Sequence, residues 1–302
     1  MSKSKTGETT GVCFFAYNTE QIDYGRLTLL AAQYVKRHMW HSNVTLITDD
    51  GTWGWLTQSN PKEIVDAAID NVVITNVEHD TNQRVHYDSP WTKFNSEFRN
   101  SNKHEVFKYT PYDRTLLLDI DFIVQNNSLD YVFESDEELV MYHDAINLRN
   151  LDPAQAEQNL KPYGIPMLWS TVVYFDKSSE LAQLFFDTWA HVKENYDFYK
   201  FLYGFPGNMY RTDYCVSIAA HILNGMGPGE LVSNFADERM IYMSQRDDIV
   251  KVNDVDEWLF LVNNRKENWK DTITRVNGEN MHIMNKRALE RHYDTLTRML
   301  NE

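Results

Sequence analysis

Short apolar runs alternate with amphipathic stretches through the first part of the chain. An unbroken apolar run of strand length occupies residues 11–17, and further strand-length segments with apolar centres occupy 43–48, 71–75 and 114–119. Residues 24–39 have helical spacing and a basic end, which suits the carboxyl end of a helix dipole, and 62–70 is a second helical stretch. Strand, helix and strand at this spacing form a βαβ unit, which predicts a parallel sheet with a right-handed crossover.

The run at 114–119 is the strongest strand candidate and is expected at the centre of the sheet. The polar segment 78–90 predicts an irregular loop, and 91–109 predicts a helix. Further along, the pattern predicts strands at 138–142, 171–175 and 257–262, helices at 181–195, 212–223 and from 286, a breaker cluster at 224–229 and a turn at 277–278.

No linker separates two independent parts of the chain. We therefore expect one α/β domain over 11–302, after a disordered lead of residues 1–10. Its mostly parallel, doubly wound, Rossmann-like sheet would be flanked by helices, with a C-terminal extension.

Composition narrows the class of protein. The 302 residues are 42% hydrophobic and 13% aromatic, as in globular proteins. No apolar run has the length of a membrane span, and Cys13 and Cys215 lie far apart in apolar surroundings, so we expect reduced thiols and a cytoplasmic location. The net charge of −15 argues against nonspecific nucleic-acid binding, although the tail from 261 is mildly basic.

Two carboxylates, Asp119 and Asp121, directly follow the central apolar strand. In a regular strand both would share one face, next to the ligand crevice at the carboxyl edge of an α/β sheet. Like charges so close repel each other, and a divalent cation would resolve that conflict. Hard oxygen ligands suit Mg²⁺ or Mn²⁺, which also bind diphosphates.

The segment Tyr112-Asp-Arg-Thr-Leu-Leu-Leu-Asp-Ile-Asp-Phe-Ile-Val124 resembles the D-x-D strand of GT-A glycosyltransferases. It is closest to the glycogenin and lipopolysaccharide galactosyltransferase type of glycosyltransferase family 8. The resemblance implies a GT-A fold, a UDP-sugar donor and retention of anomeric configuration. Residues 11–125 would bind the nucleotide-sugar, and 126–302 would form the acceptor half.

The same resemblance assigns roles to other positions, all named in this chain's numbering. It places Ala16, Tyr17 and Asn18 against the base, with Tyr24 opening the following helix. It directs Lys93 or Arg99, on the helix before the D-x-D strand, to the donor phosphates. His282 would complete the metal shell of Asp119 and Asp121, Lys286 would bind the leaving diphosphate, and Asp213 would face the sugar. As catalytic residues it implies Asp121, Asp213 and Lys286.

The chain departs from the family pattern in two places. The His282–Lys286 spacing is shorter than usual and the glycine and Lys-Pro-Trp that follow in the family are missing. The strand at 168–175 lacks the family's Asn-Ser-Gly. The segment around Arg211-Thr-Asp-Tyr214 is also similar to glycosyltransferase-like proteins of tailed phages. This similarity implies two candidate acceptors, a modified DNA base and a glycan.

Three other readings of the D-x-D remain open. A haloacid-dehalogenase-type phosphatase also uses D-x-D with Mg²⁺, and Asp247-Asp248 could be its late acidic pair. That motif normally lies on the first strand of its domain, whereas here a βαβ unit precedes it. A sugar nucleotidyltransferase is disfavoured by the absence of a Gly-rich phosphate loop after the first strand. An inactive nucleotide-sugar-binding module would bind donor without turnover.

Overall fold

A six-stranded mixed sheet forms the centre of the molecule. The computed structural model describes residues 8–75, 83–149, 159–160, 165–205, 210–227, 229–264 and 270–302. The strands of this sheet are β1 (Thr10–Ala16), β2 (Val44–Thr48), β3 (Asn71–Ile74), β6 (Arg114–Leu118), β8 (Leu139–Tyr142) and β12 (Trp169–Asp176). Their order is β3-β2-β1-β6-β12-β8. Strand β12 runs in the direction opposite to the other five strands of this sheet. The α/β prediction and the central place of β6 are therefore confirmed.

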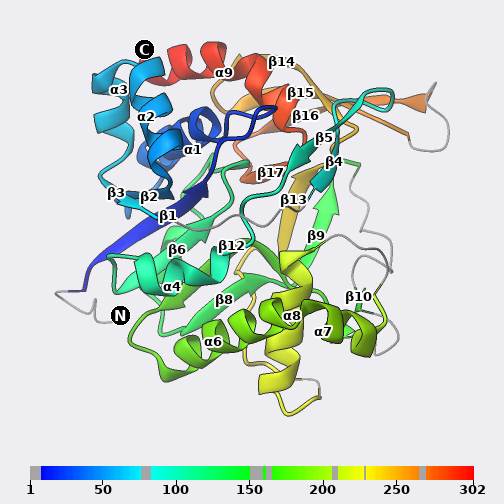
Figure 1. Ribbon diagram of the computed structural model, residues 1–302. Coiled ribbons are helices and arrows are strands. Elements are labelled where there is room, and N and C mark those ends of the chain that lie inside the picture. The colour runs from blue at the N-terminus through cyan, green and yellow to red at the C-terminus, as the bar shows by residue number, and fades with distance from the viewer. Residues whose placement is uncertain are drawn as a thin grey trace.

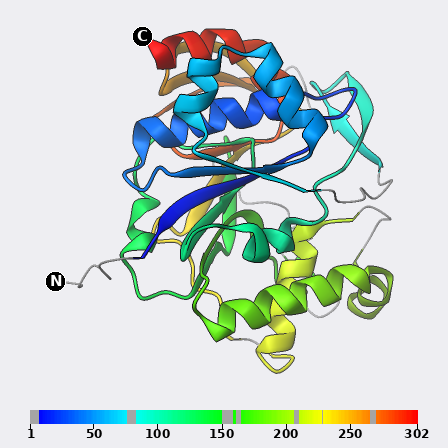
Figure 2. The ribbon, with the colours of Figure 1, turned by 60° about the vertical axis from the view of Figure 1, so that its left-hand side comes forward.

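Helices cover both faces of the sheet (Figures 1 and 2). On one side lie α1 (Tyr24–His38), α2 (Asp50–Ser59), α3 (Lys62–Ala68) and α9 (Lys286–Asn301); on the other lie α6 (Glu180–Glu194), α7 (Tyr196–Tyr203) and α8 (Thr212–Leu223), and α4 (Val106–Tyr109) precedes β6. Asp23 caps α1 by accepting from the Arg26 amide at 3.0 Å. Every residue of α1 from Leu27 to Val35 is buried, so this part of the helix is enclosed on all sides.

Smaller sheets extend the molecule beyond the central layer. A four-stranded sheet has the order β7-β17-β13-β9, from β7 (Phe122–Ile123), β17 (Met281–Ile283), β13 (Arg239–Met243) and β9 (Asp144–Asn147). An antiparallel sheet contains β14 (Asp248–Asp254), β15 (Glu257–Val262) and β16 (Thr272–Asn277). Two strand pairs, β4 (Gln83–Tyr87) with β5 (Lys93–Glu97) and β10 (Asn159–Leu160) with β11 (Ile165–Pro166), and two 3-10 turns, η1 (Lys103–Glu105) and η2 (Asp130–Phe133), complete the elements.

The helix predicted at 91–109 is wrong over most of its length. Residues Lys93–Glu97 form β5, which pairs antiparallel with β4, and helical turns begin only at Lys103. Exposed Lys93 and Asn95 alternate with more buried Phe94 and Ser96, which is the period of a strand. The loop predicted over 78–90 is likewise wrong at β4, and residues 76–82 lie outside the described residues.

Other sequence predictions missed short elements. The sequence pattern did not predict α2, which Asp49 caps by accepting from the Thr52 amide at 2.6 Å. The tail contains three strands besides the predicted β15, namely β14, β16 and β17. The predicted turn at 277–278 is confirmed, with Gly278 at a φ of 69°.

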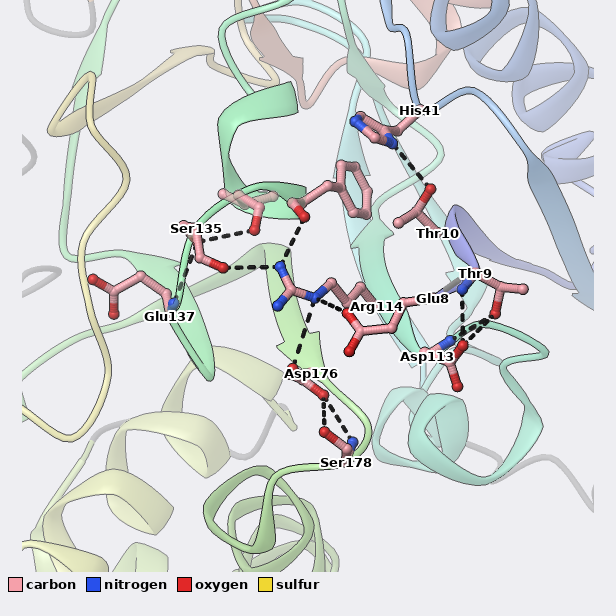
Figure 3. A network of polar contacts seen from close by, with 12 residues as sticks. Glu8, Thr9, Thr10, His41, Asp113, Arg114, Ser135, Glu137, Asp176 and Ser178 are labelled. Atoms are coloured by element: carbon pink, nitrogen blue, oxygen red, sulfur yellow. Dashed lines mark hydrogen bonds and ion pairs between the residues drawn. The ribbon is translucent and has the colours of Figure 1, made fainter. Parts of the chain in front are cut away.

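The amino end of β6 is held by a buried ion cluster around Arg114 (Figure 3). Its guanidinium donates to the carbonyl oxygens of Phe133 and Ser135 at 2.7 and 2.8 Å. Its Nε lies 2.8 Å from a Glu8 carboxylate oxygen and 3.7 Å from one of Asp176. The last part of the predicted disordered lead, residues 8–10, therefore contacts the fold, while residues 1–7 lie outside the described residues.

Two further sequence predictions concern thiols and membranes. Cys13 and Cys215 are buried and unpaired with each other, and burial raises the pKa of each thiol to about 12. Among the described helices, none is long and apolar enough to cross a membrane.

Candidate functional site

A tight turn after β6 carries the two carboxylates. The amide of Phe122 donates to the carbonyl of Asp119 at 3.0 Å, so the chain turns at Ile120 and Asp121. The expectation that both side chains project from one face of a regular strand is wrong for this reason. The Asp119 amide also donates to the Thr171 carbonyl at 2.9 Å, which ties the turn to β12.

Strand pairing brings His282 to the turn from far along the chain. After the turn, β7 pairs antiparallel with β17, and Phe122 lies opposite His282. The Nε2 atom of His282 lies 3.3 Å from an Asp121 carboxylate oxygen, and its Nδ1 lies 3.4 Å from the Thr171 hydroxyl. The first turn of α9 begins three residues after β17 and supplies Lys286.

Asp121 is a buried carboxylate with two nitrogen-containing neighbours. Its side chain is 3% exposed, and Lys286 donates to it at 2.5 Å. Burial alone would raise the pKa of Asp121, but the charge of Lys286 and the contact with His282 outweigh burial and hold the pKa far below its usual range. Burial alone would lower the pKa of Lys286, but the charge of Asp121 outweighs burial and raises it. Both groups are therefore charged at neutral pH.

Asp119 has its own lysine partner, which sequence reasoning missed. Lys103, buried in η1, forms an ion pair with the Asp119 carboxylate and donates to the Ser170 carbonyl at 3.3 Å. Nothing in the local sequence distinguishes Lys103 from a solvated helical lysine. The segment that connects the β4–β5 hairpin to β6 places Lys103 beside the turn that carries Asp119 and Asp121.

The three predicted metal ligands fit a divalent cation. One ligand atom from each of Asp119, Asp121 and His282 can be chosen so that all lie within 4.8 Å of one another. Two carboxylate oxygens and one imidazole nitrogen match the preferences of Mn²⁺ and suit Mg²⁺ through the oxygens. Thr171 beside Nδ1 of His282 would orient the ring so that Nε2 faces the ion.

A cavity of about 280 Å³ opens beside this turn. The predicted site residues that line it are Tyr17, Tyr24, Arg99, Asp119, Asp121, Asp213, His282 and Lys286. They come from the β1–α1 connection, the segment after β5, the turn after β6, and the starts of α8 and α9. The structure thus brings most of the predicted residues together, at the carboxyl edge of the central sheet.

Three predicted residues do not line the cavity. Ala16 is buried in β1, where its carbonyl accepts from the Thr48 hydroxyl at 2.6 Å. Asn18 closes the loop before α1, since its side chain accepts from the Gly25 amide at 2.8 Å and its carbonyl accepts from Arg99 at 2.7 Å. Lys93 is exposed on β5, outside the residues that line the cavity.

Tyr17 and Asp213 are each held by partners within the fold. The Tyr17 hydroxyl lies 3.0 Å from that of Thr75 at the end of β3, and burial raises the pKa of Tyr17 to about 12. Asp213, in the first turn of α8, accepts from the amide and hydroxyl of Ser170 at 3.0 and 2.8 Å and pairs with Arg211 at 3.3 Å. Burial opposes ionisation, but Arg211 and Ser170 outweigh it and lower the pKa of Asp213.

The structure adds residues that the sequence did not mark. Arg84 and His86 project from β4 into the lining, and Trp169, Arg211 and Gln245 also contribute. His86 stacks on Phe94 with ring centroids 5.4 Å apart. The alternation of β4 could have signalled that Arg84 and His86 share a face, but the segment was predicted as a loop.

Comparisons with known proteins give structural likeness without sequence relatives. No protein-family model matches the chain. No curated protein matches it either. It is similar to the glycosyltransferase GlyE of Streptococcus pneumoniae TIGR4, with 14% identity over 78% of this chain and 45% of that one and a TM-score of 0.43. It is also similar to a galactosyltransferase, LgtC, in complex with donor and acceptor sugar analogues (14% identity, 77% and 73% of the chains, TM-score 0.41). A third is mouse xyloside xylosyltransferase 1 (13% identity, 69% and 80%, TM-score 0.41). The chain spans less than half the length of GlyE.

Proposed function

We propose that this chain is a metal-dependent glycosyltransferase of the GT-A type. It would move a sugar from a nucleoside-diphosphate sugar, with UDP as the expected carrier, to an acceptor hydroxyl. The observation that supports this most is the cluster of Asp119, Asp121 and His282, with Lys103 and Lys286 beside it, in a cavity at the carboxyl edge of an α/β sheet. That edge is where open α/β sheets bind nucleotides.

In this proposal Asp119, Asp121 and His282 hold Mn²⁺ or Mg²⁺, which neutralises charge on the leaving diphosphate when it is bound. Lys103 and Lys286 exchange their carboxylate partners for phosphate oxygens and stabilise the same leaving group. The bond between the anomeric carbon and the diphosphate oxygen breaks, a bond to the acceptor oxygen forms, and the proton of the acceptor hydroxyl passes to the departing diphosphate. Asp213 accepts hydrogen bonds from sugar hydroxyls and orients the ring, and retention of configuration is the expected outcome.

Tyr17, Tyr24 and Arg99 are the proposed nucleotide-side residues. Tyr17 is fixed by Thr75, and Tyr24 opens α1 next to the cavity. Arg99 is held by Glu97 at 2.7 Å, so its guanidinium is already oriented at the cavity wall. A glycan or a modified DNA base is the proposed acceptor.

The phosphatase alternative receives less support from the geometry. Its proposed late acidic pair includes Asp247, whose carboxylate accepts from the amides of Ser244 and Asn263 at 2.9 Å each. Asp247 and Asp248 are not among the residues that line the cavity. Asp247 therefore serves a turn, and no second acidic pair joins the D-x-D at the cavity among the described residues.

The experiment that tests the proposal is hydrolysis of a panel of UDP-, GDP-, ADP- and CDP-sugars, with and without Mn²⁺. Metal-dependent release of one nucleoside diphosphate would support the proposal and identify the donor. Cleavage of p-nitrophenyl phosphate without nucleotide-sugar turnover would replace it with the phosphatase. Tight nucleotide-sugar binding with no turnover, in the presence of candidate acceptors, would favour the inactive binding module.

A further inference from the structure

The cavity contains more positive than negative side chains. Its described lining includes five cations, Arg84, Arg99, Lys103, Arg211 and Lys286, and three carboxylates, Asp119, Asp121 and Asp213. Each carboxylate has one cation as its partner, in the pairs Asp119–Lys103, Asp121–Lys286 and Asp213–Arg211. Arg99 pairs with Glu97 outside the lining. Within the described parts of the chain, Arg84 is the cation of this cavity with no carboxylate partner.

Arg84 is also short of hydrogen-bond acceptors. Its guanidinium lies over the Phe98 ring, 3.3 Å from the centroid, and donates once, to the Tyr210 carbonyl at 2.9 Å. Its Nε is buried and has no acceptor among the described residues. Burial lowers the pKa of Arg84 and outweighs the opposing effect of Tyr24 and Asp213, while the charge of Arg211 adds to the lowering. A guanidinium with no carboxylate in ion-pair contact and with a shielded Nε that lacks an acceptor is costly unless a ligand supplies the missing oxygens.

Two residues near Arg84, Arg211 and His86, add nitrogen-containing side chains to the same cavity wall. The hydrogen bond to Tyr210 places Arg84 next to the residue that precedes Arg211, and both arginines line the cavity, one from β4 and one from the start of α8. His86, two residues along β4, also has a buried Nε2 without a hydrogen-bond partner in the described residues. Two neighbouring side chains on one strand thus carry buried nitrogen atoms without partners at a cavity wall.

The diphosphate of a donor does not account for this excess. Lys103 and Lys286 are balanced by Asp119 and Asp121. A divalent cation carries two positive charges and a nucleoside-diphosphate sugar carries two negative charges, so binding both leaves the net charge of the cavity unchanged. The charge of Arg84 remains, beside the Arg211–Asp213 pair, which is the side where the sugar is proposed to lie.

We propose that Arg84, with Arg211 and His86, forms an anion subsite that binds a carboxylate or phosphate group carried by one of the two sugar substrates. This rests on the proposed glycosyltransferase function and names the class of sugar the cavity takes. Planar guanidinium groups bind carboxylate and phosphate oxygens in pairs, and the imidazole of His86 provides a further contact.

The test is calorimetric binding in Mn²⁺ with ligands matched in shape and different in charge. The donor arm compares UDP, UDP-glucose, UDP-galactose, UDP-glucuronate and UDP-galacturonate. The acceptor arm, with UDP present, compares glucose with glucose 6-phosphate and glucuronate. The variants are Arg84→Gln and Arg84→Lys. The matched control is Lys251→Gln, which removes the same charge from an exposed position on β14.

The wild-type protein should bind the anionic member of at least one arm about tenfold or more tightly than its neutral counterpart. Arg84→Gln should abolish that preference and leave the affinity for UDP within about twofold of the wild type. The control Lys251→Gln should leave the affinity for every ligand within about twofold. Arg84→Lys should keep part of the preference, and it serves as the deciding variant if Arg84→Gln does not fold. The arm in which the preference appears identifies the substrate that carries the anion.

Two results would overturn the inference while the proposed function stands. One is a wild-type protein with no anionic preference in either arm. The other is an Arg84→Gln variant that loses affinity for UDP as much as for every other ligand, which would assign Arg84 to the diphosphate. Failure of UDP, GDP, ADP and CDP alike to bind in Mn²⁺ would instead remove the proposed function itself.

Discussion

Two arginines, the buried Arg114 and the partly buried Arg84, have different surroundings. Arg114 at the amino end of β6 faces two carboxylates and two carbonyl oxygens (Figure 3). Arg84 at the cavity has one carbonyl and an aromatic face. A guanidinium whose carboxylate partners come from the fold contributes to folding, whereas one without a carboxylate in ion-pair contact keeps the capacity to bind an anionic ligand.

The same difference separates the two ends of β6. At the amino end, partners surround Arg114 and no cavity adjoins it among those described. At the carboxyl end, Asp119 and Asp121 have lysine partners that also line the cavity and can exchange them for ligand oxygens. Substitutions at the first end should therefore change stability, and substitutions at the second should change turnover.

The largest expected effect is at the carboxyl end. Asp121→Asn keeps the shape of the side chain and removes the charge that pairs with Lys286 and would face the metal. We expect donor turnover to fall by about 10³-fold or more, because transition-state charge stabilisation of this kind has that magnitude. Steady-state hydrolysis of the donor in Mn²⁺ measures it. Asp66→Asn, an exposed carboxylate on α3, is the control and should keep wild-type turnover. An Asp121→Asn protein with near-normal turnover would remove this end of β6 from catalysis.

The amino end should show the reverse pattern. Arg114→Met leaves Asp176, 9% exposed, without its cation, so we expect the free energy of unfolding to fall by about 3 kcal/mol. Turnover per folded molecule should stay within about twofold. Urea denaturation and donor hydrolysis on the same samples give both values. Arg291→Met breaks two ion pairs at a surface position and should cost less than about 1 kcal/mol. Equal losses for the two variants would mean that burial of Arg114 contributes little.

The sequence predicts the parts of this molecule whose signals are local. The apolar run before Asp119 predicts β6, and helical spacing predicts α1, α6, α8 and α9 close to their observed bounds. The positions of His282 and Lys286 followed from a family resemblance, and the pairing of β17 with β7 shows physically why they reach the turn.

The missed elements depend on contacts distant in sequence. Lys93–Glu97 becomes a strand only because it pairs with β4, and its propensity alone does not reveal that. Lys103 and Arg84 meet the site through that hairpin and the segment that follows it. A charged residue on a short polar segment has the same local signal whether it faces solvent or a cavity.

The hairpin also corrects which lysine precedes the D-x-D strand at the cavity. Lys103→Met removes the partner of Asp119 and a cation of the cavity, and we expect turnover to fall about 10- to 100-fold. Lys93→Met changes an exposed side chain on β5, so its effect should be at least about tenfold smaller. Donor hydrolysis of the two variants, side by side, decides between them. A larger loss from Lys93→Met would return that lysine to the phosphate-binding role that the resemblance implied.

The smallest expected effect compares two histidines, the buried His86 in the cavity wall and the partly buried His104 beside Trp189. Burial, reinforced by Lys286 and Arg84, lowers the pKa of His86 to about 3, and burial lowers that of His104 beside Trp189 to about 4. An unfolded chain protonates histidine below about pH 6.5, but the folded chain leaves His86 neutral until about pH 3. Each such group therefore costs the folded state stability as pH falls through that window. Between pH 7 and pH 5, His86→Asn should lose about 1–2 kcal/mol less unfolding free energy than the wild type, measured by urea denaturation at each pH. His104→Asn should change the pH dependence of unfolding in the same direction. If a bound anion contacts His86, UDP-glucuronate should reduce the effect of His86→Asn on that pH dependence and leave the effect of His104→Asn unchanged. Identical acid sensitivity of wild type and His86→Asn would mean that His86 is already solvated in the cavity.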